Sequence, residues 1–205
     1  GAVRRNLEGA TMKALGHAMQ AANSSRSYVK DQQGWLNQAV STAMGAAGGA
    51  GGLPTALAEL PVTTTLLLRV IQGVAAEHGF DPAAENVQLD CVHVFTAAGP
   101  LADDDSADLG FLTVRMALTG RAMNAVIARV APRLALVMGQ KLAAQAVPVL
   151  GAVAGAATNY AYTSYYQDMA HVHFGLRSLA IEADIPQEEL VARLRQKMGR
   201  TPSKI

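Results

Sequence analysis

The sequence predicts an all-α protein, a multi-helix bundle with long central helices rich in Gly and Ala, for three reasons. Apolar residues recur every three to four positions along most of the chain. Alternating apolar and polar runs joined by hairpin turns are not found in it. Small residues are abundant and aromatics make up only 5%, which favours helices packed by close backbone approach. At 205 residues, the chain is expected to form a single domain, residues 1–205.

Three helices are predicted in the first part of the chain: residues 2–23 within an N-terminal region 1–30, residues 29–47, and the segment from Pro61 to His78. The glycine-rich run Gly48–Gly52 is expected to interrupt regular structure. We place the start of the third helix at Pro61, because a proline in the first helical turn loses no hydrogen bond. Gly79 is the expected end of that helix.

Four further helices are predicted: residues 83–97, residues 109–137 with a bend near Pro132, residues 149–183, and residues 187–198 within a C-terminal amphipathic helix and tail, 185–205. Asp184 and Pro186 are typical of the residues that precede and start a helix. Residues 87–95 have a composition that would also suit a strand, so this segment is the most direct test of the all-α prediction.

Composition and spacing exclude several functions. The net charge of +1 leaves no excess of cations for a phosphate backbone, so we expect no nucleic-acid partner. Phosphate-binding glycine loops and nucleophile elbows are missing from the sequence, and we expect no cofactor. His171 and His173 diverge by about 200° around a helix, and the run Asp103–Asp105 lacks the glycine of a calcium loop. We therefore predict no metal site. Cys91 is single and cannot form an internal disulfide.

Two segments, residues 32–58 and 142–167, contain no charged residue, and each exceeds the roughly 20 residues that cross a bilayer. The second is rich in Ala and contains several polar side chains, which makes it a poor membrane span. Three interpretations remain open: a transmembrane helix, a helix that lies on a membrane or inserts conditionally, and a buried helix of a bundle. The charges within residues 1–20 argue against a secretion signal there.

A polar stripe is predicted on the helix that begins at residue 149. At about 100° per residue, Asn159, His173 and Arg177 share one face of this helix. If that face is buried, its polar groups need partners, since an unpaired buried charge is strongly destabilising. The helix after Pro61 and the helix after the acidic run both offer such partners. We therefore predict one polar or ligand-binding cluster made of Thr64, Thr65, Arg69, Asp108, Arg115, Asn159, His173 and Arg177.

Five segments, in chain order, match a known pattern. They are Glu59–Ile71 (ELPVTTTLLLRVI), Cys91–Phe95 (CVHVF), Asp108–Phe111 followed by Arg115, Gly151–Asn159, and Gln167–Phe174 followed by Arg177 and Leu179. In these segments the chain resembles the EcsC family, a bacterial family named after a gene that neighbours an ABC transporter. The resemblance implies an association with transport, secretion and the cell envelope, and it implies no particular reaction. His93 stands where the family pattern has Glu, so any role of that Glu is not carried over.

These observations favour a helical regulatory or accessory protein rather than an enzyme. We expect it to associate with a membrane surface or a membrane-protein complex through its two uncharged segments, and to be cytoplasmic, peripheral at the inner face of the membrane. Two alternatives remain open. One is a hydrolase or lipid-modifying enzyme with His173 as general base. The other is an intracellular protein that binds a lipid, an acyl chain or an anionic small molecule through Arg69 and Arg177.

Overall fold

The computed structural model describes residues 15, 17–22, 24–25, 39–44, 46, 53–95, 97, 132 and 150–200. Its long helices are α3 (Leu53–Glu77), α4 (Glu85–Val94), α6 (Leu150–Ala183) and α7 (Gln187–Arg200). Residues 39–44 are also helical. Within the described residues there is no strand, so the predicted all-α class is confirmed. The segment with a strand-like composition lies mostly in α4 and is helical.

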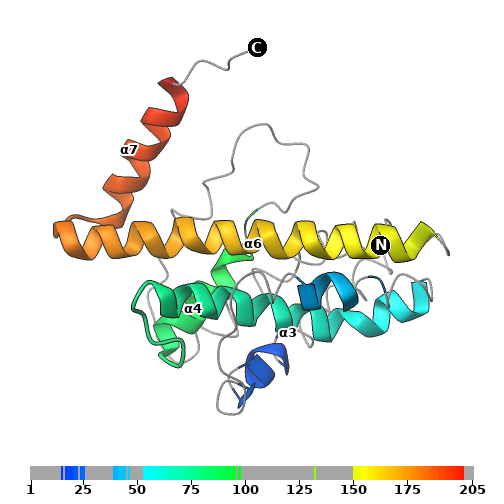
Figure 1. Ribbon diagram of the computed structural model, residues 1–205. Helices are drawn as coiled ribbons and strands as arrows, with labels where there is room; N and C mark the ends of the chain where they lie inside the picture. Colours follow the sequence, from blue (N-terminus) through cyan, green and yellow to red (C-terminus); the bar gives the residue numbers. More distant parts are fainter. Residues whose placement is uncertain are drawn as a thin grey trace.

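Helix α6 forms the long axis of the protein. Its 34 residues correspond to about 51 Å of helix. Helices α3 and α4 lie along one side of α6, whereas α7 projects away from its C-terminal end on the other side (Figure 1). Helices α3 and α6 run in the same direction, so their N-terminal halves lie at the same end of the bundle (Figure 1).

The core lies between α6 and the helices that it covers. Its largest fully buried side chains are Leu15, Leu67, Leu68, Ile71, Phe95, Tyr162, Tyr166 and Phe174. The rings of Phe95 and Tyr166 meet edge to face, with centroids 5.0 Å apart, which is a favourable aromatic geometry. Burial raises the pKa of Tyr162 to about 12, so its phenol stays neutral in the core.

The predicted start of the third helix is wrong. Helix α3 begins at Leu53, and Pro61 lies inside it. Pro54 instead occupies the first turn, where a proline loses no hydrogen bond. Within the helix, the side chain of Pro61 is exposed, and the Thr65 hydroxyl donates to the Pro61 carbonyl oxygen at 2.8 Å. The end of α3 at Glu77 agrees with the prediction to within one residue, and Gly79, two residues later, takes a positive φ of 81°.

Helical residues also occur just past the predicted end of the first helix. Ser24 and Ser25 are helical, beyond the end expected at residue 23. The Ser25 hydroxyl donates to the Ala22 carbonyl oxygen at 2.9 Å, which is compatible with helical geometry. The predicted bounds of α6 and α7 agree with the structure to within two residues. The run Gly48–Gly52, the acidic run and the predicted helix 109–137, apart from the helical Pro132, lie outside the described residues.

Candidate functional site

The polar stripe of α6 faces the interior. Asn159 and His173 are buried, as are Thr163, Tyr166 and Ala170, which continue the same face at helical spacing, and Arg177 is partly buried. On the facing helix α3, Thr63, Thr64 and Gln72 are buried, whereas Thr65 and Arg69 are partly exposed. Most of the stripe of α6 and part of the polar edge of α3 therefore lie inside the bundle.

The N-terminal half of the stripe binds a segment that the prediction did not include. The Asn159 amide Nδ2 donates to the Ser41 carbonyl oxygen at 2.9 Å, and the Ser41 hydroxyl donates to the Asn159 carbonyl oxygen at 3.3 Å. The Thr163 hydroxyl donates to Ser41 Oγ at 2.6 Å. All three residues are buried. These bonds join residues 39–44 to α6, and so bring the two uncharged segments of the sequence against each other.

Asn159→Ala is expected to lower the free energy of unfolding by about 1–2 kcal/mol, because the buried Ser41 carbonyl loses its amide donor. Urea denaturation followed by circular dichroism measures the change. Thr158→Ala, one position earlier on a less buried face of α6, is the matched control and should change stability by less than about 0.5 kcal/mol. Equal stability of Asn159→Ala and the wild type would show that this hydrogen bond contributes nothing.

The C-terminal half of the stripe meets α4. The Arg177 guanidinium forms an ion pair with the Asp90 carboxylate and lies over the ring of Phe80, with Cζ 4.5 Å from the ring centroid. His173 Nε2 lies 3.6 Å from Asp90 Oδ1. Asp90 was missing from the predicted cluster. The only sequence signal for it is its position three residues before His93, which puts both on one face of α4.

His93 and His173 face each other across this contact, with ring centroids 6.2 Å apart. Both side chains are buried. Burial, with a smaller contribution from the neighbouring His173, lowers the pKa of His93 from 6.5 to about 4, and the Asp90 carboxylate partly opposes this shift. His93 is therefore a neutral imidazole at pH 7.

The remaining predicted residues lie elsewhere. The Arg69 guanidinium donates to Ser25 Oγ of the first helix. The Thr65 hydroxyl donates to the Pro61 carbonyl oxygen within α3. Asp108 and Arg115 lie outside the described residues. The structure thus brings His173 and Arg177 together around Asp90, and places Asn159 in a separate contact with Ser41. A ligand-binding role for the predicted residues stays a prediction.

His171 and His173 contact different partners. His78 Nε2 and His171 Nδ1 are 3.2 Å apart, and His171 Nε2 lies 3.8 Å from Glu77 Oε2. His173 instead faces α4. Their divergence around α6 agrees with the predicted angle. In the part of the chain that the structure describes, no group of three His, Cys, Asp or Glu side chains is suited to hold a metal ion.

The contacts of His173 and Arg177 with Asp90 lie inside the protein, between α4 and α6. The Arg177 cation is already engaged by a carboxylate and an aromatic face, and His173 is 5% exposed. An anion at Arg177 would have to displace Asp90, and a substrate of His173 would have to enter the packed interface of α4 and α6. The geometry therefore gives no support to the general-base and anion-binding alternatives.

Fold and site together define an all-α bundle whose central helix carries an internal polar stripe. Comparison with protein families gives a match to the EcsC protein family over residues 18–179, and the chain belongs to this family. The comparisons with curated proteins and with solved structures give no match. Among the described residues, no helix is both long and apolar enough to span a membrane.

Proposed function

We propose that this protein is a helical accessory or regulatory protein that attaches reversibly to a membrane surface through one end of its bundle. We call this end the charge-poor end. It consists of residues 39–44, the first part of α3 (53–68) and the first part of α6 (150–167). The observation that carries the proposal is the separation of charge along the long axis of the bundle.

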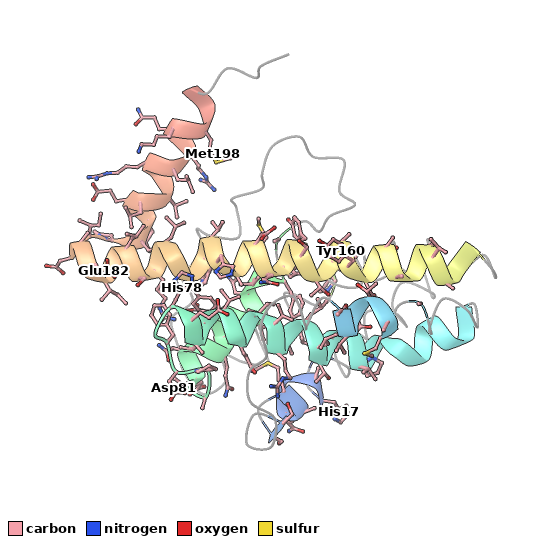
Figure 2. The ribbon with its side chains drawn as sticks, in the orientation of Figure 1. His17, His78, Asp81, Tyr160, Glu182 and Met198 are labelled. Atoms are coloured by element: carbon pink, nitrogen blue, oxygen red, sulfur yellow. The ribbon has the colours of Figure 1, made fainter. Side chains whose placement is uncertain are left out.

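The charge-poor end contains a single charged residue, Glu59, within those three ranges. The opposite end of α3 and α6, with α4 and the turn that leads to α7, contains Arg69, Glu77, Asp81, Glu85, Asp90, Asp168, Arg177, Glu182 and Asp184. Figure 2 illustrates the separation: Glu182 and Asp81 lie at the charged end, and Tyr160 lies on the first half of α6. Charges are costly to bring against a bilayer, so a membrane contact suits the charge-poor end.

Large apolar side chains are exposed at this end. Val153 is 74% exposed on α6, and Val62 is 50% exposed on α3. Val40 and Tyr160 are also exposed. Tyrosine suits the boundary between water and hydrocarbon, because its ring is apolar and its hydroxyl is polar. The hydrogen bonds of Ser41 to α6 hold the two uncharged segments together, so that both contribute to the same contact.

The expected attachment is weak. Each of these exposed side chains gains about 1 kcal/mol on leaving water, because part of it is already buried and full burial of a Val side chain is worth about 1.5–3 kcal/mol. Four such side chains give at most about 4 kcal/mol, which is weaker than the marginal and reversible anchoring by one myristoyl chain, about 5.5 kcal/mol. A reversible surface contact of this strength fits an accessory role better than permanent anchoring.

Flotation with phosphatidylcholine–phosphatidylglycerol vesicles tests the proposal. The wild type is expected to float with the vesicles, and Val153→Asp is expected to reduce binding about tenfold, because it removes apolar area and adds a charge. Ile181→Asp is the matched control. Ile181 is 66% exposed on the same helix but lies at the charged end.

Ile181→Asp should therefore bind vesicles like the wild type. A wild-type protein that stays at the bottom of the gradient contradicts the proposal. Equal loss of binding in Val153→Asp and Ile181→Asp also contradicts it, because the contact would then not belong to the charge-poor end.

A further inference from the structure

We propose that the charge-poor end recognises bilayers whose headgroups are loosely packed, and that it does not recognise anionic headgroups. The inference rests on the proposed membrane attachment and specifies the kind of surface that this attachment requires. It follows from the lack of cations among the described residues of this end, from the direction of its apolar side chains, and from the small number of large ones.

Attraction to anionic lipids requires Lys or Arg near the membrane. Residues 39–44, 53–68 and 150–167 contain neither, and Glu59, the one charged residue in these ranges, has the same sign as an anionic lipid. The described residues of this end therefore contribute no attraction to anionic lipid that added salt could screen. The attraction that they supply comes from apolar burial.

The apolar side chains of α6 point to one side, away from its polar stripe. Val153, Ala157 and Tyr160 recur at spacings of four and three on the exposed face of α6, whereas Asn159 and Thr163 face inward. Tyr160, labelled on the first half of α6 in Figure 2, is 49% exposed. Ser164 continues this outer face without adding a charge. On this face of α6, the large apolar side chains Val153 and Tyr160 thus alternate with the small residues Ala157 and Ser164, and none of the four is charged.

Two large apolar side chains bury little apolar area in a bilayer. Helices with an uncharged polar face and little apolar area bind where a bilayer already exposes hydrocarbon between its headgroups, as it does when strongly curved. A tightly packed, flat bilayer offers no such gaps. The chemistry of this end therefore selects curved or loosely packed membranes.

Helix α7 is the alternative source of membrane binding. Its exposed cations Arg195 and Lys197, and the partly exposed apolar Met198, would make attachment dependent on anionic lipid. Figure 2 places Met198 on α7, well away from Tyr160. The two sources therefore differ in their response to lipid charge and salt, and they can be separated by variants.

The experiment measures binding of the full chain to four vesicle samples: small and large vesicles of phosphatidylcholine, and large vesicles with added phosphatidylglycerol at low and at high salt. We expect about tenfold tighter binding to small than to large phosphatidylcholine vesicles. We expect less than about a twofold effect of phosphatidylglycerol or salt. Tyr160→Asp should abolish the preference for small vesicles, and the double variant Arg195→Glu, Lys197→Glu should keep it.

Equal binding to small and large vesicles overturns the inference. Binding that requires phosphatidylglycerol, weakens with salt and is lost in the α7 double variant overturns it too, and assigns the contact to α7. If Val153→Asp still weakens binding while curvature has no effect, the membrane attachment stands and only the preference for loose packing fails. Lack of binding to every vesicle ends both proposals. Circular dichroism of each variant verifies that the helical fold is intact.

Discussion

Asp90→Asn is expected to lower the free energy of unfolding by about 3 kcal/mol, one of the two largest effects that the structure predicts. The substitution keeps the size of the side chain but removes the charge that pairs with Arg177 and faces His173. Breaking a buried ion pair costs about 3–5 kcal/mol. We expect the lower end of this range, because the side chains of Arg177 and Asp90 are 20% and 28% exposed and water screens part of the interaction.

Urea denaturation of three variants tests the expectation. Asp168→Asn, an exposed carboxylate on α6, is the matched control and should change stability by less than about 0.5 kcal/mol. The double variant Asp90→Asn, Arg177→Met should recover part of the loss, because it also removes the buried cation. If Asp90→Asn is as stable as the wild type, the ion pair does not hold α4 on α6. If the double variant is no better than Asp90→Asn, the loss does not come from the unpaired arginine.

Helix positions were predictable where the cause is local. The stripe of α6 follows from 3.6 residues per turn, so the sequence places Asn159, Thr163 and His173 on one face, and all three are buried. The end of α3 at Gly79 follows from the freedom of glycine to take a positive φ. In both cases the cause lies in the nearby sequence: the helical spacing of residues in α6, and the presence of a glycine after α3.

The partners of these residues were not predictable, because they come from distant parts of the chain. Asn159 and Ser41 are 118 positions apart, and Arg177 and Asp90 are 87 apart. The local pattern does not distinguish Ser41 from other polar residues, and it gives for Asp90 only the spacing of three residues from His93. The start of α3 was misplaced because two prolines suit a first helical turn, and the helix begins at Leu53, so that Pro54 and not Pro61 lies in this turn.

Acidification is expected to destabilise the protein through His93 by up to about 3 kcal/mol between pH 6.5 and 4. Burial, with a smaller contribution from His173, lowers the pKa of His93 from 6.5 to about 4 in the folded state. Between these pH values the unfolded chain binds a proton at His93 that the folded chain does not bind. The unfolded state is therefore favoured as the pH falls, and the loss is complete below about pH 4. The difference between the two pKa values corresponds to about 3 kcal/mol.

His93→Gln removes the titrating ring and keeps a polar side chain of similar length, so its stability should fall less than that of the wild type over this pH range. The difference between the two stability–pH curves isolates His93 from the carboxylates, which are common to both proteins. His17→Gln is the matched control, because His17 is exposed and lies on the first helix, away from α4 (Figure 2). The stability of His17→Gln should depend on pH in the same way as that of the wild type. If the curves of His93→Gln and the wild type run parallel from pH 7 to pH 4, His93 is not held neutral between α4 and α6. A flatter curve for His93→Gln would mean that acid loosens the same helix contact that Asp90 and Arg177 hold together at neutral pH.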